Sequence, residues 1–507
     1  MRRFAVAFAI LLTLSAGAFS FRLVPTGRSV QTPRRTFTPL HTYYMSPTGS
    51  DSNNGLTTST PWLTYNGNGH TINCGDIVYA MSGTYTSSAN FASISTVPSN
   101  CPSTSGGLDG TGGIYFAQII CMTPFECFAS SKGTGYPAVK FSANYWAIQG
   151  FVLSSANADG GCVGIEPGSA TTIHHIAVVN TICNGAHANG FSSYPHSANH
   201  GSDYIVYIGD IAYNAAQGTD ECYSGFSVYE PVIQDKNSGT HIFLAGNFSW
   251  GNAHAECGSG TIDSDGNGFI LDDWGGVQIG QSAYTGTGVV RDNISWDNNG
   301  DGISIGGNGT TAATIKIYNN TAYGNSQGTI APYGGDELFM GTVQGTGPVS
   351  ISNNLFVSTN YTYKVTGHFG STNGATAYNY TVQCYACTTA ATVSGNYIFN
   401  SANTSYQEWS NRPGSPAFVF GSNTLSTSPG FASPPAHGAI GAPNCSSYAT
   451  TTACMATVIA DFAPSGGAIG LGYQKPSGTC NNAGDSDFPT WMKGIIPIGL
   501  ITLPCGM

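Results

Sequence analysis

The sequence predicts an all-β solenoid of stacked coils, each built from three short strands. Three observations favour this fold class. Only 8% of the 507 residues are charged and 68 are Gly, a composition that is poor for helices and rich in turns and strand formers. An all-β chain of this length forms either several sandwiches or one repeat array. A short segment with one central polar residue recurs along the chain, and this repeat favours the array.

The repeat places a polar residue between two short apolar runs. The seven central residues are Asn180, Asp210, Asn247, Asn293, Asn320, Asn354 and Asn396. A second Asn follows four or five residues after five of them, at Asn184, Asn214, Asn252, Asn298 and Asn325. A third run often begins with Gly, at residues 190, 225, 268 and 302. We therefore expect coils stacked about 4.8 Å apart, with the central residues in one hydrogen-bonded ladder.

The segment YYMSPTGSDSNNGLTTSTPW, residues 43–62, is followed by GDIVYAMSGTY, residues 75–85. Together with the repeat, these segments resemble right-handed parallel β-helix proteins of the pectin-lyase-like superfamily, including family 9 polysaccharide lyases. The resemblance covers about residues 41–400 and implies a right-handed parallel β-helix with an Asn ladder. It is specific for the fold, which hosts lyases, hydrolases, esterases and inert adhesins.

The chain divides into four predicted parts. Arg2 and Arg3, an apolar run at 4–14 and small residues after it have the layout of a secretory signal peptide. The predicted parts are a signal peptide at 1–20, a linker at 21–40, the β-helix at 41–400 and a disulfide-containing C-terminal cap or extension at 401–507. No later segment approaches about 18 consecutive apolar residues. We therefore expect a secreted, extracellular protein with no membrane span.

Cysteine count and charge exclude several classes. Fourteen cysteines in an oxidising compartment allow up to seven disulfides. Cys384 and Cys387 have CxxC spacing, but no second CxxC or nearby His accompanies them, so a structural disulfide is favoured over a metal. A net charge of -11 with 15 basic residues argues against a nucleic-acid or anionic-membrane partner. The expected partner is a polysaccharide, and the expected state is a monomer.

Acidic residues concentrate around DSDGNGFILDD, residues 263–273. Between Glu256 and Asp301 there are eight acidic residues and one basic residue, Arg291. Close carboxylates repel one another, so such a cluster indicates a bound cation or a role in proton transfer. Long loops at about 253–267 and about 273–288 flank the run GFILD, and long loops beside a flat sheet predict a cleft.

A calcium ion is the first hypothesis for this cluster. Asp263, Asp265 and Asn267 place oxygen ligands at alternate positions before a Gly, as in the first half of an EF-hand loop. Trp274 stands where that loop has its bidentate Glu, so another acid must complete the site. The candidates for that acid are Asp272, Asp273 and Asp301. A hydrogen-bonded turn without metal, or catalytic carboxylates alone, are the alternatives.

Two catalytic mechanisms remain open from the sequence. The resemblance to family 9 lyases implies calcium-assisted β-elimination with a lysine base, but Asp272 stands at the position of that lysine. Arg291, Lys236 or Lys316 would then have to reach the site from a neighbouring coil. The alternative is hydrolysis by paired carboxylates. A non-catalytic polysaccharide-binding or adhesive solenoid is the third possibility.

The carboxylate pair is predicted from strand alternation. Phe269 and Leu271 point inward, which turns Asp272 outward onto the groove floor. Asp301 begins the equivalent strand one coil later, so we expect it within roughly 5 to 10 Å of Asp272. Asp273 is the second possible partner. The residues at the starts of these strands should form a column of Asn189, Ser224, Asn267, Asp301 and Asp336.

Aromatic residues supply candidate sugar contacts. Trp274 and Tyr284 lie in the predicted wall loop and Tyr229 ends a Gly-led strand, so these three are predicted to contact the substrate. Trp250 and Trp296 share one repeat position and are predicted to pack. The predicted function is cleavage of an extracellular, acidic polysaccharide by calcium-assisted β-elimination or by carboxylate-based hydrolysis.

Overall fold

The computed structural model describes the chain from residue 38 onward with gaps, within a compact unit that spans Thr36–Met507. The described residues are 38–86, 93–101, 116–131, 133–168, 172–218, 222–236, 239–252, 266–306, 312–325, 336–341, 347–359, 362–364, 376–378, 380–384, 387, 391–410, 418–425, 427–432, 434, 456, 458–465, 487 and 489–492. The predicted signal peptide and nearly all of the predicted linker lie outside these residues.

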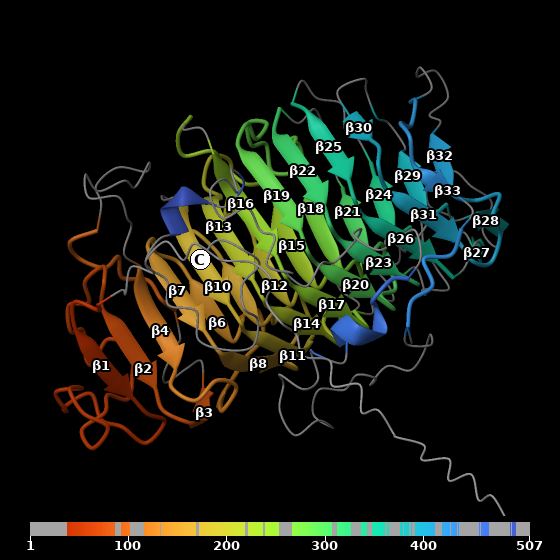
Figure 1. Cartoon of the computed structure of the whole chain (residues 1–507). Helices are drawn as coiled ribbons and strands as arrows, with labels where there is room; N and C mark the ends of the chain where they lie inside the picture. Colours follow the sequence, from red (N-terminus) through yellow and green to blue (C-terminus); the bar gives the residue numbers. More distant parts are fainter. Residues whose placement is uncertain are drawn as a thin grey trace, which may run out of the picture. The chain divides into compact units, whose positions relative to one another are not determined.

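Successive strands of the chain pass in turn through three parallel sheets (Figure 1). Each strand pairs with its counterparts in the preceding and following coils, and all of these pairings are parallel. This arrangement confirms the predicted parallel β-helix of three-strand coils. An antiparallel pair, β27 (Thr362–Lys364) with β28 (Thr376–Tyr378), stands apart from the three sheets.

The sheets are numbered in the order in which each coil passes through them. The first sheet contains β1 (Thr42–Met45), β2 (Ile77–Ala80), β4 (Ala117–Cys121), β7 (Trp146–Gln149), β10 (Ile173–Val179), β13 (Ser202–Ile208), β16 (Thr240–Ala245), β19 (Thr287–Arg291), β22 (Thr314–Tyr318), β25 (Val349–Ser352) and β30 (Ala391–Val393). The second contains β3 (Gly83–Thr86), β5 (Cys127–Ser130), β8 (Phe151–Ser155), β11 (Ile182–Ala186), β14 (Ile211–Tyr213), β17 (Phe248–Trp250), β20 (Ile294–Trp296), β23 (Thr321–Tyr323), β26 (Leu355–Ser358), β31 (Tyr397–Asn400) and β33 (Thr424–Leu425). The third contains β6 (Val139–Phe141), β9 (Val163–Ile165), β12 (Phe191–Ser193), β15 (Phe226–Tyr229), β18 (Phe269–Asp272), β21 (Ile303–Ile305), β24 (Leu338–Met340), β29 (Val382–Cys384) and β32 (Glu408–Ser410).

The core is built from like side chains stacked in successive coils. On the third sheet, the rings of Phe191, Phe226 and Phe269 stack with centroid separations of 4.7 and 4.8 Å. Their inward direction follows the alternation of the strands, since an apolar residue at every second position faces the interior. Trp250 and Trp296 stack at 4.5 Å on the second sheet and are buried, so the predicted packing role is confirmed.

The predicted polar ladder follows the first-to-second sheet turn. The backbone N–H of Asp210 donates to Asn247 Oδ1 at 2.8 Å, and the N–H of Asn247 donates to Asn293 Oδ1 at 2.9 Å. The same bond is repeated through Asn320, Asn354, Asn396 and Asn423. Each buried side chain therefore satisfies a backbone donor of the preceding coil, which no strand pairing would satisfy.

The prediction for Asn180 is wrong. Ile182 pairs with Ile211, so the residue in register with Asp210 is Thr181, whose N–H donates to Asp210 Oδ1 at 2.8 Å. Asn180 precedes the ladder position by one residue and has a positive φ of 48°. The sequence could not distinguish the two positions, because Asn is also favoured in the left-handed conformation at a turn.

Part of the second predicted Asn series forms a further ladder. Asn252 Nδ2 donates to Asn298 Oδ1 at 2.8 Å, Asn298 Nδ2 donates to Asn325 Oδ1 at 2.8 Å, and Asn325 Nδ2 donates to Glu337 at 2.6 Å. Asn184 is exposed instead. The shorter ladder ends at a carboxyl group because Glu337 begins the next third-sheet strand region.

Four disulfides join cysteines that are both among the described residues. They are Cys74–Cys101, Cys121–Cys127, Cys162–Cys183 and Cys384–Cys387. The CxxC pair is therefore closed as a disulfide, as the structural interpretation predicted. The helical residues that are described include no stretch both long and apolar enough to cross a membrane.

Residues near the C-terminus cover two of the sheets. Trp491 lies in η4 (Thr490–Met492) and donates from Nε1 to the Thr240 carbonyl at 2.8 Å on the first sheet. Asp487 forms an ion pair with Lys316 at 2.6 Å. Phe462 packs against Trp296 on the second sheet. The rings on these two outer faces are thus removed from solvent, which stabilises the fold by the burial of apolar area.

Replacing Asn293 by Ala should lower the free energy of unfolding by about 1–3 kcal/mol, because the buried N–H of Asn247 and two carbonyl-type acceptors lose their partner. Urea unfolding followed by circular dichroism measures this change. Asn184→Ala removes an exposed Asn of the same repeat and serves as the control, with an expected change near zero. Equal stability of the two variants would show that the ladder does not stabilise the solenoid.

Candidate functional site

The predicted calcium ligands are only partly described. Asp263 and Asp265 lie outside the described residues. Asn267 accepts the N–H of Asp301 at 2.7 Å through Oδ1 and donates to Ser224 Oγ at 3.3 Å. In the part of the chain that the structure describes, no three His, Cys, Asp or Glu side chains are placed to hold a metal ion.

The predicted column at the starts of the third-sheet strands is present. Ser224 donates its N–H to Asn189 Oδ1 at 2.7 Å, and Asp336 donates its N–H to Asp301 Oδ1 at 2.9 Å. Asn267 joins the two halves through its bonds to Ser224 and Asp301. The column is a structural ladder like the Asn ladder, since the Asn189, Asn267 and Asp301 side chains each accept a backbone N–H of a neighbouring coil.

The predicted proximity of Asp272 and Asp301 is wrong. Phe269 pairs with Ile303, so Asp301 lies opposite Asn267 at the start of the strand. Asp272 ends the same strand, five residues further on, which is about 16 Å along the strand direction. The two carboxyl groups therefore lie at opposite ends of the third-sheet strands. Their separation exceeds the distances of about 5–9.5 Å between the two carboxyl groups of glycosidases.

Asp301 belongs to a buried acidic group instead. Burial, followed by the nearby Asp301 and Glu337 charges, raises the pKa of Asp336 well above its usual range. Burial also raises the pKa of Glu337 to about 8, against the lowering effect of hydrogen bonds from Asn325. A raised pKa favours the neutral form of these two carboxyl groups, which reduces the repulsion between them and Asp301. The position of Asp301 is explained by this structural role.

A different group of side chains lies on the outer face of the third sheet, where its strands end. Tyr229 pairs with Asp272, and the preceding pairing of Ser193 with Val228 brings Tyr194 next to Tyr229. The two tyrosine rings are 5.2 Å apart and tilted by 37°. Tyr194 is 49% exposed, and Tyr229 and Asp272 are half-buried. We call Tyr194, Tyr229 and Asp272 the tyrosine surface.

Charged groups extend the row of the tyrosine surface. The N–H of Tyr194 donates to the Ile165 carbonyl, which places Glu166 beside Tyr194 in the preceding coil. Glu166 forms an ion pair with Lys140 of β6. Along the solenoid the order is therefore a paired carboxylate, two tyrosines and the Asp272 carboxylate. Of the predicted substrate residues, Tyr229 alone lies in this row.

Asp273 and Glu230 anchor the loop beside the tyrosine surface. Both residues have positive φ, 44° and 39°, as the chain turns away from the sheet. Asp273 Oδ2 accepts the N–H of Gln278 at 2.8 Å, and Glu230 Oε1 accepts the N–H groups of Gln278 and Ile279 at 2.6 and 3.0 Å. Both carboxyl groups are buried. This geometry gives Asp273 a role in holding loop 274–281.

The two loop-anchoring carboxyl groups also influence each other. Burial, together with a hydrogen bond to Asp273, raises the pKa of Glu230 from 4.5 to about 7. Burial, followed by the charges of Glu230 and Asp272, raises the pKa of Tyr229 above its usual range. Glu230 therefore changes its protonation near neutral pH, while Tyr229 stays a neutral phenol there.

The predicted sugar contacts of Trp274 and Tyr284 are not supported. Their side chains are 2% and 1% exposed, and their rings meet edge to face at 5.1 Å in the core. Trp274 Nε1 donates to the Val228 carbonyl at 3.1 Å, and Tyr284 donates its hydroxyl proton to Asp203 at 2.6 Å. The loop folds inward because burying two large rings stabilises it more than exposing them to solvent.

Arg291 lies on a different sheet from Asp272. It ends β19 of the first sheet, and its guanidinium carbon lies 5.2 Å from the Phe243 ring centroid and 5.9 Å from that of Tyr318. Arg291 Nε is 3.7 Å from Asp292 Oδ2. These contacts place the buried cation among aromatic rings, where cation–π attraction stabilises it. The structure does not bring Arg291 to the tyrosine surface.

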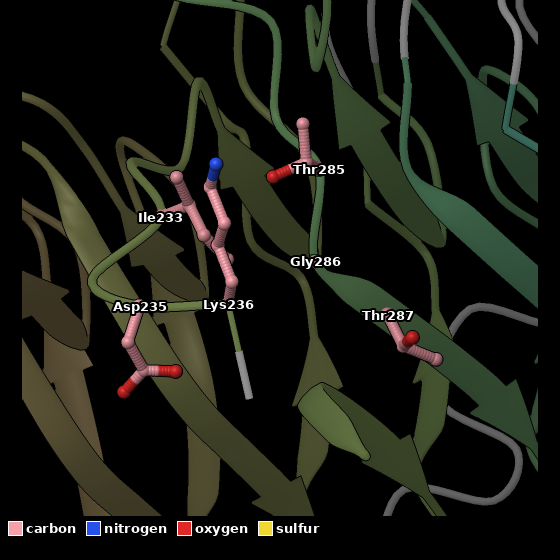
Figure 2. Close-up of a pocket in the computed structure, with 6 residues that line it drawn as sticks. All are labelled: Ile233, Asp235, Lys236, Thr285, Gly286 and Thr287. Carbon is pink, nitrogen blue, oxygen red and sulfur yellow. The ribbon is translucent and has the colours of Figure 1, made fainter. Parts of the chain in front are cut away.

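A pocket of about 370 Å³ lies where the third sheet turns into the first sheet (Figure 2). One wall is the segment after β15 that contains Ile233, Asp235 and Lys236, and the other is Thr285–Thr287 at the start of β19. Sequence reasoning missed this pocket. Its two walls are about 50 residues apart in the chain, and only the strand register brings them together.

The chain is similar in fold to solved structures of low sequence identity. One is pectate lyase Pel9A, with 16% identity, a TM-score of 0.47 and coverage of 78% of this chain and 84% of that chain. Others are a rhamnogalacturonan lyase (14%, 0.32, 76% and 87%) and a lacto-N-biosidase of Eubacterium ramulus (13%, 0.38, 76% and 68%). No protein-family model and no curated protein matches the chain.

Replacing Glu230 by Gln should change how stability depends on pH. The raised pKa favours the protonated carboxyl group in the folded state, so its contribution to the free energy of unfolding is present below about pH 4.5. That contribution is lost as the pH rises to about 7. The variant should therefore gain stability relative to the wild type across this range.

Urea unfolding at several pH values between 4.5 and 7.5 measures this difference. Glu126→Gln, an exposed position in another coil, controls for the loss of one carboxyl group. A difference between wild type and Glu230→Gln that stays constant across the range would contradict the assignment.

Proposed function

We propose that the chain binds an extracellular polysaccharide along the tyrosine surface. The observation that carries this proposal is the pair of adjacent tyrosine rings, Tyr194 and Tyr229, in register on the outer face of a parallel sheet. An exposed aromatic ring offers an apolar face for the C–H face of a sugar and a hydroxyl group for its polar edge. A second ring in the next coil repeats this contact along the solenoid axis.

The groups around the rings support a polymeric ligand. Asp272 follows Tyr229 in the next coil, and the Lys140–Glu166 pair precedes Tyr194. Carboxylate and ammonium groups beside aromatic rings supply the few directional hydrogen bonds that orient a sugar. Because these groups occupy five successive coils, the ligand that uses them all extends over several sugar units.

Cleavage of the bound polysaccharide is the second candidate function. The observation that favours it is a half-buried Asp272 carboxyl group in the row, with Lys236 exposed on the segment that follows Tyr229. A lysine is suited to abstract a proton in β-elimination, and a carboxyl group is suited to hydrolysis. Asp301 and Arg291 have no part in this proposal, because the structure places them elsewhere.

A polysaccharide panel separates the candidates. Absorbance near the band of unsaturated uronates detects elimination, and new reducing ends detect hydrolysis. Retention of the protein in gels that contain the polymer detects binding without cleavage. Absence of retention and of both products across acidic and neutral polymers would remove the proposed function.

Tyr194→Ala should weaken binding to a retained polymer about two- to tenfold, the effect of losing one aromatic contact. Affinity electrophoresis over a range of polymer concentrations gives the dissociation constants. Phe128→Ala is the matched control, since Phe128 is 47% exposed on the second sheet, away from the tyrosine surface. Equal weakening in the two variants would contradict a specific role for Tyr194.

A calcium site at DSDGNG, residues 263–268, is a proposal that rests only on the alternating oxygen ligands in the sequence. If Asp263 and Asp265 bind Ca²⁺, calcium at 100 times its dissociation constant should stabilise the fold by about 2.7 kcal/mol. Thermal unfolding of calcium-loaded protein before and after EDTA measures this contribution. Asp263→Asn with Asp265→Asn should abolish the effect of EDTA. An unchanged melting temperature in the unsubstituted protein would reject the calcium site.

A further inference from the structure

The pocket between segment 233–236 and Thr285–Thr287 is called the corner pocket. One buried carboxylate, that of Asp203, forms hydrogen bonds that hold both of its walls. Asp203 Oδ2 accepts the N–H of Gln234, which belongs to the wall that contains Ile233, Asp235 and Lys236. Asp203 Oδ1 accepts the hydroxyl proton of Tyr284, the residue that precedes the opposite wall. A single side chain therefore holds the two walls at a set distance from each other.

The Asp203 carboxylate is itself held by a dense network. His241 Nδ1 lies 3.1 and 3.0 Å from the two carboxylate oxygens, and the N–H of Tyr204 donates to Oδ1 at 2.9 Å. Tyr204 also donates its hydroxyl proton to Asp235 Oδ1 at 2.8 Å, so this network fixes a residue that lines the pocket. The Tyr204 ring is stacked between His175 and His241, at 4.4 and 4.1 Å.

This arrangement resembles the support of a binding site more than that of an ordinary turn. Burying a carboxylate with no exposed surface is costly unless several hydrogen bonds compensate. Groups behind a binding site that lock its lining residues are a general requirement for a preorganised ligand pocket. Gly286 packs closely against this network as well, because a Cβ at this position would lie 2.4 Å from the Tyr284 hydroxyl oxygen.

The lining residues define the class of ligand. Figure 2 shows the Lys236 ammonium and the Thr285 hydroxyl group near one end of the pocket and the Asp235 carboxylate near the other, with Ile233 beside Lys236. A neutral sugar unit matches this set, because its hydroxyl groups both accept from an ammonium and donate to a carboxylate. A sugar that carries a net charge would be attracted by one of these two charged side chains and repelled by the other, whereas a neutral sugar can hydrogen-bond to both.

The pocket lies to the side of the tyrosine surface. Tyr229 and Lys236 belong to one coil, and Asp272 and Thr285 belong to the next coil. A polymer that follows the tyrosine surface crosses these coils along the axis, whereas the pocket is reached by moving around the coil. A ligand that fills both places therefore has a side group that leaves its main chain.

We propose that this pocket binds a single neutral sugar unit carried as a branch on the polysaccharide. The proposal rests on the proposed binding of a polysaccharide by the tyrosine surface. The pocket residues would contact the branch, and Asp203 would act as a positioning residue that never touches the ligand. The substrate class is thereby narrowed to polymers with short neutral side chains.

Titration calorimetry with free sugars tests the pocket separately from the tyrosine surface. The probes are the neutral sugars glucose, galactose, mannose, xylose and arabinose, with galacturonic acid and glucosamine as charged comparisons. We expect at least one neutral sugar to bind. Lys236→Met and Thr285→Val, both at exposed positions, should each weaken that binding about tenfold or more, as expected for the loss of a hydrogen bond to a charged or polar group. Phe128→Ala should bind the sugar like the unsubstituted protein.

Three results of this titration would contradict the proposal that the pocket binds a neutral sugar. One is that no neutral sugar binds. Another is that the charged sugars bind and the neutral ones do not. The third is that binding survives in Lys236→Met and Thr285→Val but is lost in Tyr194→Ala, which would assign the sugar to the tyrosine surface.

Pairs of polymers with one backbone test the branch. Arabinoxylan against xylan and galactomannan against mannan differ by single neutral side units. The branched member of a pair should bind about tenfold tighter or more, and Lys236→Met should remove this preference. Equal affinity for both members of each pair would contradict the proposal that the pocket binds a branch of the polysaccharide. Sugar binding in the pocket without retention by any polymer would reject the proposed function and leave the pocket as a site for free sugars.

Discussion

Axial hydrogen bonding between buried amide side chains is the constraint on which the rest of this structure depends. At the turn between the first and second sheets, the chain leaves one backbone N–H in each coil that strand pairing does not satisfy. Asn247, Asn293, Asn320, Asn354 and Asn396 satisfy these donors from the following coil. An unsatisfied buried donor is costly, so the ladder fixes the register of successive coils. Loops of unequal length are then tolerated between strands.

A fixed register converts distant sequence positions into neighbours. It places Tyr194 beside Tyr229 and Tyr229 beside Asp272, and it brings the wall at 233–236 opposite Thr285. Both proposed sites therefore depend on side chains that are in contact only because three coils stack in register. The two sites differ in their support, since the tyrosines stand on strands and the pocket walls are held by Asp203 from behind.

Structural hydrogen bonds explain two members of the acidic cluster, Asp273 and Asp301, and two buried acids outside it, Glu230 and Asp336. Asp273 and Glu230 hold a loop by accepting its N–H groups, and Asp301 and Asp336 are links of a column at the strand starts. Burial raises the pKa of Glu230 to about 7, so a proton removes part of the repulsion. A high local density of carboxylates therefore does not by itself indicate a metal or a catalytic pair.

The sequence alone determined the class of fold, because strand alternation and a recurrent central Asn are local patterns that survive irregular loops. It also predicted the column from Asn189 to Asp336, which follows from one position per repeat. The sequence misplaced Asn180 in the ladder by one residue. It also placed Asp301 near Asp272, because knowing that two residues lie in neighbouring coils does not show that they lie at the same end of their strands. Only the tertiary structure decided that Trp274 and Tyr284 turn inward and that Asp203 joins two pocket walls. Those outcomes depend on packing between loops about 80 residues apart, for which no periodic pattern exists in the chain.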